Sequence, residues 1–442
     1  MAAPQIVWFR QDLRLADQPA LAAAARAGPV LAVYVRDEVS PGVRPMGGAS
    51  RWWLHHSLAA LDASLRALGG ALLLRSGPAA EVLGRLLEET GAEAIHATAH
   101  SEPWWQAIEA RLRPRLRLVG ATRMLAPGTV RTGAGLPFRV FTPFWRASLR
   151  HLPPPPPLPV PRDLAFAPLA HGERLEDWGL LPRAPDWSRG FAAWQPGEAG
   201  AHAALAAFLP RAAAYGARRD FPSEPATSRL SPHLHFGEIS AGAVWHAVVS
   251  AAGTHAEAFT RQLVWREFAH ELLLQHPDGH VRPHRAEFDR MEWTDTAREP
   301  GQRWLRAWQR GRTGYPIVDA GMRELWQTGW MHNRVRMIVA SFLTKHLRID
   351  WREGERWFWD TLVDADLANN AMGWQWVMGS GVDAQPYFRI FAPVAQSEKF
   401  DALGYIRRFA PEYSGHAPVN PIVEHQAARA AALAAYARMR RR

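Results

Sequence analysis

Tryptophans alternate with carboxylates, amides and arginines near the C-terminal end of the chain. Residues 329–391 contain Trp330, Trp351, Trp357, Trp359, Trp374 and Trp376. The same stretch holds DADLANN at residues 364–370, which brings two carboxylates and two amides directly before GWQW. Buried polar groups require hydrogen-bond partners. The stretch therefore predicts a polar ligand among the indole rings, or else a core whose polar groups satisfy one another.

A second polar group lies at residues 215–231, with the sequence YGARRDFPSEPATSRLS. It offers the hydroxyls of Thr227, Ser228 and Ser231 and the guanidinium of Arg229 just before Pro232. The backbone N–H groups at the start of a helix attract phosphate. The same residue types are also typical of a helix cap and turn. Both interpretations stay open from the residues alone.

A third group, FTRQLVWREF, spans residues 259–268. Phe259, Leu263 and Phe268 have the spacing of the apolar face of a helix. Trp265 stands beside Arg266, and this combination can stack on an exposed nucleic-acid base. Trp265 could equally serve as an anchor of the core, and the spacing does not decide between these roles.

Composition limits the classes of protein to consider. The chain has 442 residues and a formal charge of +10, because 52 lysines and arginines outnumber 42 aspartates and glutamates. This excess favours an acidic partner, nucleic acid first, although an arginine-preferring genome gives the same excess. The absence of cysteine excludes disulfides and thiolate sites, and we expect no metal. We find no apolar run of about 18 residues and no secretory signal, so we expect a cytoplasmic protein.

Strand and helix signals alternate along the first 120 residues. The pattern predicts strands at residues 5–9, 30–35, 71–74, 94–97 and 116–119 and helices at 19–27, 52–68, 79–89 and 104–112. Repeated βα units of this kind predict a doubly wound parallel sheet. No GxGxxG or GxxxxGK[ST] motif occurs in this half, so the motifs do not support phosphate binding there.

The remainder of the chain is predicted to be helical. Candidate helices span residues 203–215, 241–252, 256–276, 302–311, 318–328, 334–345 and 354–363, and the basic end ARMRRR is expected to be a frayed helix tail. Five consecutive prolines at 153–157 predict an extended spacer. We therefore predict an α/β domain at 1–130, a Pro-rich interdomain linker at 131–200 and an all-α domain at 201–442.

The order of the motifs carries a family resemblance. TSRLSP, WREF, GRTGYPIVDAGMREL, GWMHNRVRM, IDWREGER, DADLANN, GWQW and PYFRIF follow one another, and VWFRQDLRLADQPAL stands near the N-terminus. The chain resembles the DNA photolyase and cryptochrome family in this order and spacing, most closely a bacterial cyclobutane pyrimidine dimer photolyase. The resemblance implies an antenna-type α/β domain and a helical domain that binds a U-shaped FAD and DNA. It also implies light-driven splitting of pyrimidine dimers in DNA, with a blue-light photoreceptor or a (6-4)-type or other photolyase as the alternative.

The resemblance also assigns roles to residues around the flavin. Asn370 matches the residue that faces flavin N5, and Arg336 and Asp364 match an ion pair beside the isoalloxazine. A second chromophore of folate or deazaflavin type is a further expectation, although HSEPWW at residues 100–105 matches neither type well. The implied cofactor-binding residues are Tyr215, Thr227, Ser228, Arg229, Leu230, Ser231, Phe259, Arg336, Asp364, Ala365, Asp366 and Asn370.

Electron transfer to a buried flavin requires closely spaced oxidisable rings. Trp374 and Trp351 match the inner two members of the tryptophan relay of the family, and Trp293 matches the outermost. The segment after Trp293 is longer than usual, so Trp304 is an alternative for the outer position. With Asn370, these tryptophans are the implied catalytic residues. Each indole would also pack as a core side chain.

The resemblance implies damaged DNA as the partner of a monomeric enzyme. Photolyases are among the enzymes known to turn their target out of the duplex. Trp265 and Trp376 would wall the lesion pocket, and Gln262 stands where many dimer photolyases carry a glutamate. Ala392 is a second departure, because asparagine is common there. The implied DNA-binding residues are Arg218, Arg219, Gln262, Trp265, Arg266, Asn333, Arg334, Met337, Trp376, Arg389 and Gln396.

Overall fold

The N-terminal half is built on a parallel sheet. A computed structural model of the chain describes residues 2–168 and 170–441. The strand order is β3-β2-β1-β4-β5, and all pairs are parallel. The strands are β1 (Gln5–Phe9), β2 (Val30–Arg36), β3 (Leu72–Ser76), β4 (Ala94–Ala99) and β5 (Leu116–Ala121). The order reverses between β1 and β4, which is the type of position where open parallel sheets bind ligands.

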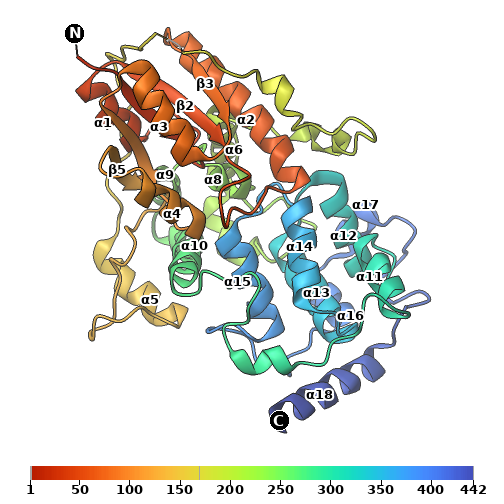
Figure 1. Cartoon of the computed structure of the whole chain (residues 1–442). Coiled ribbons are helices and arrows are strands. Elements are labelled where there is room, and N and C mark those ends of the chain that lie inside the picture. Colours follow the sequence, from red (N-terminus) through yellow and green to blue (C-terminus); the bar gives the residue numbers. More distant parts are fainter. Residues whose placement is uncertain (1, 169, 442) are drawn as a thin grey trace.

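Helices cover both faces of this sheet (Figure 1). Ile6 and Trp8 of β1 pack in one hydrophobic cluster with Val82 and Ile108, whereas Val7 and Phe9 belong to another cluster. Successive side chains of a strand point to opposite faces, so β1 is buried on both sides. The covering helices are α1 (Pro19–Ala27), α2 (Gly48–Ala67), α3 (Ala79–Thr90) and α4 (Pro103–Arg111). The predicted doubly wound domain is confirmed.

The segment predicted as a linker is more structured than a spacer. Within residues 131–200 lie α5 (Phe141–Ser148), the 3₁₀ turns η1 (Leu149–His151), η2 (Leu175–Trp178) and η3 (Ser188–Ala193), and the start of α6 (Glu198–Phe208). Phe141 and Phe144 are buried in the core of the helical half. The domain limits themselves stay a prediction.

The proline run is tied to both halves of the molecule. The carbonyl of Pro154 accepts a hydrogen bond from His246 at 2.8 Å, and the N–H of Leu158 donates to Asp17 at 2.9 Å. His246 belongs to the helical half and Asp17 to the α/β half. The run therefore lies where the chain passes from one half to the other, as its composition indicates.

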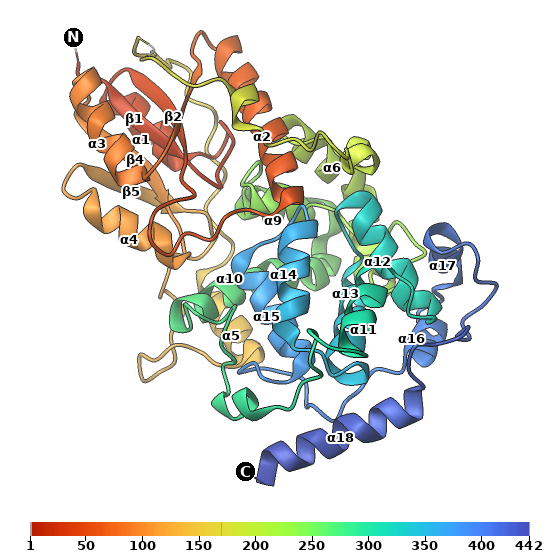
Figure 2. The ribbon, with the colours of Figure 1, turned by 45° about the vertical axis from the view of Figure 1, so that its right-hand side comes forward.

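The C-terminal half is helical, which confirms the predicted fold class (Figure 2). Its α-helices are α7 (Tyr215–Arg218), α8 (Ser231–His235), α9 (Ala241–Ala252), α10 (Glu257–Gln275), α11 (Gly301–Gln309), α12 (Pro316–Thr328), α13 (Asn333–Ser341), α14 (Trp351–Thr361), α15 (Leu367–Met378), α16 (Pro393–Lys399), α17 (Leu403–Phe409) and α18 (His425–Arg441). Shorter turns are η4 (Leu209–Ala214), η5 (Gly253–Ala256) and η6 (Ala286–Arg290), and η7 (Phe342–His346) is a π-helical turn.

Helices α14 and α15 begin at aspartate caps. Asp350 accepts a hydrogen bond from the N–H of Arg352, and Asp366 accepts one from the N–H of Asn369. The two helices approach closely because Gly354 lacks a side chain. A Cβ at Gly354 would lie 2.0 Å from the indole ring of Trp374. The glycine therefore lets Trp374 lie directly against α14.

The basic end of the chain is helical as far as Arg441, and Arg442, the last residue of the ARMRRR stretch, lies outside the described residues. Helix α18 extends to Arg441 and buries Ala428, Ala432, Ala435 and Met439. Arg438 forms an ion pair with Glu292. Small residues on one face let α18 lie close to the helical half. Among the described residues, none of the helices combines the length and apolar character that a membrane span needs.

Candidate functional site

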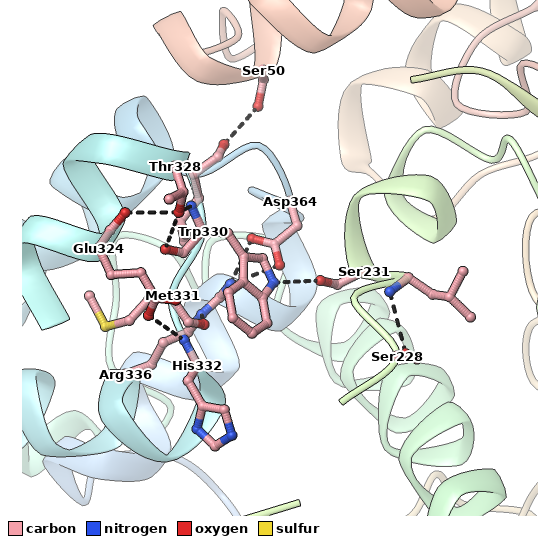
Figure 3. A network of polar contacts seen from close by, with 12 residues as sticks. Ser50, Ser228, Ser231, Glu324, Thr328, Trp330, Met331, His332, Arg336 and Asp364 are labelled. Atoms are coloured by element: carbon pink, nitrogen blue, oxygen red, sulfur yellow. Dashed lines mark hydrogen bonds and ion pairs between the residues drawn. The ribbon is translucent and has the colours of Figure 1, made fainter. Parts of the chain in front are cut away.

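Trp330 joins two of the predicted cofactor segments. Its indole N–H donates to the hydroxyl of Ser231 at 3.2 Å (Figure 3). The guanidinium of Arg229 lies 4.8 Å from the centroid of the same ring, and that of Arg336 lies 5.8 Å from it. Residues 227–231 therefore contact the GWMHNRVRM segment through the indole ring of Trp330. The prediction placed Trp330 in the polar stretch but gave it no role of its own.

The backbone at Arg229 is held in an unusual conformation. Its φ angle is +55°, which is uncommon for a residue other than glycine and is often found at functional sites. No side chain caps the short helix α8 that follows. The hydroxyl of Ser228 accepts only a long bond from the N–H of Leu230, at 3.3 Å. The hydroxyls of this segment are therefore not used as helix caps, which favours the ligand-binding interpretation.

Helix α13 carries several predicted residues, and a buried histidine positions its start. The ring Nδ1 of His332 accepts the N–H of Arg334 at 3.2 Å, and the N–H of His332 donates to Glu324 of α12 at 3.1 Å. Burial lowers the pKa of His332 to about 4, so the ring is neutral at physiological pH and free to accept that bond. This cap fixes the direction in which Arg336 leaves the helix.

The predicted ion pair between Arg336 and Asp364 is present. One guanidinium nitrogen donates to both carboxylate oxygens, at 2.8 and 3.1 Å, and Nε donates to the carbonyl of Met331 at 2.7 Å. The side chain of Asp364 is only 4% exposed. Charge-assisted bonds of this kind are strong and directional. The pair is therefore a rigid polar wall of the site.

Asp366 supplies a second buried carboxylate. One oxygen accepts the backbone and side-chain N–H groups of Asn369 at 2.8 and 2.7 Å. The other lies 3.7 Å from His235 and 3.5 Å from His270. Burial alone raises the pKa of Asp366, but His270 and His235 outweigh it and hold the pKa well below its usual range. Asp366 is therefore ionised at neutral pH.

A buried ring nitrogen beside this carboxylate has no partner. Nε2 of His270 and Nδ1 of His235 face Asp366, whereas Nδ1 of His270 has no hydrogen-bond partner. Buried polar atoms are normally paired. The unpaired Nδ1 of His270 therefore fits a site that receives a polar group such as a flavin and its ribityl chain.

Asn370 is oriented by a chain of contacts to the other half of the molecule. Its amide nitrogen donates to the backbone carbonyl of Glu355 at 3.1 Å and to the Glu355 carboxylate at 2.9 Å. Arg44 donates two hydrogen bonds of 2.8 Å to the same carboxylate. Only the NH₂ group can meet two acceptors, so the amide oxygen must face the opposite side. Asn370 thus presents an acceptor, whereas Asn369 is already bonded to Asp366.

The remaining predicted cofactor residues lie on the same half. Phe259 is buried, and its ring contacts Tyr215 and Phe208 at centroid distances of 5.1 and 4.9 Å. Leu230 is buried, and Thr227 is partly exposed. Ala365 lines a cavity of about 60 Å³ between the two halves. Trp104 and Trp105 of the predicted antenna segment line that same cavity.

The two inner relay tryptophans belong to one core. Trp351 is 1% exposed and Trp374 is 2% exposed, and both pack in the largest hydrophobic cluster of the helical half. Trp308 contacts Trp374 edge to face at 6.2 Å, a contact that sequence spacing did not identify. Trp293 and Trp304 both pack partly buried on this cluster. The outer relay position therefore stays open between them.

Trp265 and Trp376 line a common hollow, as expected for two walls of one pocket. One face of Trp265 is covered by Phe141 of α5, with ring centroids 3.5 Å apart and planes at 9°. Phe141 was missed because it lies in the segment interpreted as a linker. Its signal was the apolar aromatic run around residues 138–145.

The predicted DNA-contacting arginines do not all face the solvent. Arg218 is exposed and pairs with Glu224, and Arg334 pairs with Asp220 at 2.9 Å. Arg389 is exposed. The other residues of this set lie at or near the surface, with Asn333 exposed and Arg219, Gln262, Met337 and Gln396 half-buried.

Arg266 is turned inward. Its guanidinium donates to the carbonyls of Thr122 and Leu234, both at 3.4 Å, and its side chain is 14% exposed. It joins the two halves of the molecule rather than facing solvent. Within the described part of the chain, no group of His, Asp and Glu side chains has the arrangement of a metal site.

Two family models match this chain. Residues 5–162 match a family model described as DNA photolyase, and residues 259–438 match one described as the FAD binding domain of DNA photolyase. A deoxyribodipyrimidine photo-lyase of Agrobacterium fabrum is 47% identical over 480 residues, which cover 99% of this chain and 98% of the relative.

Solved structures agree. A bacterial class III photolyase from Agrobacterium tumefaciens has a TM-score of 0.93 and 45% identity, over 100% of this chain and 98% of that one. An archaeal photolyase from Sulfolobus tokodaii with two FAD molecules has a TM-score of 0.82 and 28% identity, over 98% of this chain and 100% of that one.

An α/β half followed by a helical FAD-binding half defines a two-domain flavoprotein, and FAD is its cofactor. This chain belongs to the DNA photolyase family.

Proposed function

We propose that this protein is a deoxyribodipyrimidine photo-lyase, which uses light to split cyclobutane pyrimidine dimers in DNA. The proposal rests on one group of residues in the helical half. The Arg336–Asp364 pair, ionised Asp366 and oriented Asn370 stand together with buried Trp374, near a hollow walled by two tryptophans. The name and activity of the 47% identical relative agree with this site.

The residues of the polar wall are suited to hold a flavin and to favour its reduced form. Bound reduced FAD, once excited by light, supplies the electron that opens the cyclobutane ring and receives it back. Asn370 offers a fixed acceptor to an N–H group, such as the one a reduced flavin carries at N5. Arg336 and Asp364 compensate each other's charge, so the wall can orient a polar ring without adding net charge.

The phosphate side of the cofactor is assigned to the strained segment. Residues 227–231 form the turn at Arg229, where hydroxyls and a guanidinium are available. Tyr215 and Phe259, whose rings contact each other, are proposed to complete this side of the site. Leu230 and Ala365 contribute backbone groups from buried positions.

Electrons for photoreduction are proposed to travel inward from an outer tryptophan, Trp293 or Trp304, through Trp351 and Trp374 to the flavin. The two inner rings are buried in one core.

DNA is proposed to bind over the hollow between Trp265 and Trp376. Asn333, Met337, Gln262 and Gln396 would contact the extruded dimer. Arg218, Arg219, Arg334 and Arg389 would neutralise flanking phosphates. Arg266 is left out of this set because its N–H groups are bonded to carbonyls inside the molecule. We further propose that the protein works as a cytoplasmic monomer.

A second chromophore is proposed for the cavity between the halves. Tyr34, Trp105 and Trp359 give it aromatic walls, and Asp37 and Arg44 give it charged ones. Planar pigments with polar edges suit such a lining.

Illumination of the purified, reduced protein with a dimer-containing oligonucleotide tests the proposal. We expect recovery of thymine in blue light and none in the dark. A Trp376→Ala variant should lose most of the recovery and keep its FAD absorbance, since it changes only the DNA-side wall. If the fully reduced protein recovers no thymine under light, the repair function is wrong and a photoreceptor role takes its place.

A further inference from the structure

The loop that follows α15 carries Arg389 and an exposed aromatic side chain. Residues 379–391 contain no helix or strand, and the side chain of Phe388, next to Arg389, is 62% exposed. Its last part makes short internal bonds, from the N–H of Arg389 to the carbonyl of Pro386 and from that of Ile390 to Phe388. Such short turns do not fix where the loop stands on the molecule. The position of the loop therefore depends on its contacts with the residues packed under it.

Lys345 is one of these contacts. It lies in the π-helical turn η7 and is 1% exposed. Its ammonium donates to the backbone carbonyl of Arg389 at 3.0 Å and stands 5.2 Å from the ring centroid of Tyr387. Within the described residues, Lys345 has no carboxylate at ion-pair distance. A carbonyl and an aromatic face thus take the place of a counter-ion.

Further contacts to the last part of the loop come from α13 and α18, while its first part is bonded to Trp376 and Arg285. The hydroxyl of Ser341 accepts the N–H of Phe391 at 3.3 Å. Tyr387 is 1% exposed, and Tyr436 of α18 stacks on it at 4.7 Å and 15°. Phe288 closes the stack at 6.2 Å from Tyr387. The loop is therefore clamped between η7 on one side and α18 on the other.

We propose that Lys345 is a positioning residue for DNA binding: its ammonium holds the Arg389 backbone carbonyl, and so aims the Arg389 guanidinium at a DNA phosphate. Tyr436 assists from α18 by holding Tyr387. The proposal rests on the proposed function, because it takes Arg389 as a phosphate contact.

The local structure supports this role. A π-helical turn widens the helix by one residue and is frequent at functional sites. Here all five residues of the turn are buried, Lys345 and His346 included. Burial lowers the pKa of Lys345 to about 7, so keeping this amine inside is unfavourable for the fold. An unfavourable buried group with one specific polar contact is typical of a functional constraint.

The test compares Lys345→Met with Thr344→Val in the holoprotein. Thr344 is the matched control, because it is fully buried in the same turn and bonds only to its own helix, at the Ala340 carbonyl. We expect Lys345→Met to bind dimer-containing duplex about tenfold more weakly, the size of one lost buried hydrogen bond. Hydrogen exchange at residues 385–391 should accelerate in Lys345→Met alone. Repair per absorbed photon at saturating DNA should match the parent in both variants.

A double-mutant cycle with Arg389→Ala separates the possibilities. If Lys345 acts through Arg389, Lys345→Met adds no further loss of affinity in the Arg389→Ala background. An additive loss would overturn the proposal, and so would unchanged loop exchange. Tyr436→Leu, which changes the clamp from its α18 side, should also accelerate loop exchange and provides a variant outside the buried turn. Repair by the parent protein tests the proposed function separately. The proposed role of Lys345 can therefore fail while the repair function holds.

Discussion

At the scale of single residues, orientation decides what a side chain can do. Asn369 and Asn370 are adjacent amides in DADLANN, but they use their N–H groups differently. Asn369 closes the cap of α15, whereas Asn370 reaches back to Glu355 on α14 and leaves its oxygen free to accept. The family resemblance selected Asn370, and the contacts supply the physical reason.

A substitution at Trp374 tests the assignment of the tryptophan relay. Trp374→Phe should slow photoreduction of oxidised FAD by at least tenfold, because a phenyl ring is much harder to oxidise than an indole. Repair by pre-reduced enzyme should stay close to the parent rate. Flavin absorbance under blue light measures photoreduction, and thymine recovery measures repair.

Trp308→Phe is the matched comparison, because Trp308 is buried and packs against Trp374. If Trp308 has only a packing role, its replacement leaves photoreduction near the parent rate. Equal loss of photoreduction and repair in Trp374→Phe would contradict the relay assignment.

At the scale of elements, close helix packing positions the polar wall. Helix α14 carries Trp351, Gly354 and Glu355, and α15 carries Asn370 and Trp374. The distance between the two helices therefore sets both the Asn370–Glu355 bonds and the position of the inner relay ring. Gly354 is the residue that permits this distance.

Gly354→Ala should therefore destabilise the protein and weaken FAD retention. The added Cβ would meet the Trp374 ring at 2.0 Å, and overpacking of this kind costs about 1–3 kcal/mol. Thermal unfolding and the ratio of flavin to protein absorbance measure both effects.

Gly373→Ala is the control, because it lies in α15 with open space around the added Cβ. Alanine is the better helix former, so this variant should gain about 0.5–1 kcal/mol. A loss of stability in both variants would show that helix packing at Gly354 is not the cause.

The π-helical turn gives a pH prediction at the same scale. The pKa of Lys345 is about 7 in the folded protein and 10.5 when the chain is unfolded. Between these values the unfolded chain holds the extra proton, so the contribution of Lys345 to the free energy of unfolding rises with pH. Lys345→Met should remove this rise between pH 7 and 10, as measured by denaturant titration across that range. Thr344→Val should keep the parent profile, and an unchanged profile in Lys345→Met would contradict the assigned pKa.

At the scale of the whole molecule, the +10 charge matters only where the arginines face solvent. Arg334 is partly exposed at the start of α13, whereas Arg266 is bonded between the two halves. Both side chains carry one positive charge, but only the first can release a counterion when DNA binds.

Arg334→Ala should lower the slope of log K against log salt by about one, since one phosphate contact is lost. Arg266→Ala should leave that slope unchanged, and its effect should appear in stability. Binding of a dimer-containing duplex at several salt concentrations measures the slope. Equal slopes for the parent and Arg334→Ala would remove Arg334 from the set of phosphate contacts.

Sequence by itself determined the elements and the order of the motifs. Helix α9 was predicted with its observed bounds, and β1 and α1 likewise. These elements are specified by local periodicity, capping and turn residues, which involve neighbours a few positions away. The same local information, in a fixed order, identified the family, the cofactor and the pair Arg336–Asp364.

Tertiary structure alone decided which way the side chains face. Phe141 covers Trp265, Arg266 reaches Thr122, and Lys345 holds the carbonyl of Arg389. Each contact joins residues that are far apart in the chain, and no local pattern encodes such a meeting. Burial against a particular neighbour depends on how whole helices pack, so these roles became visible only when the two halves were assembled.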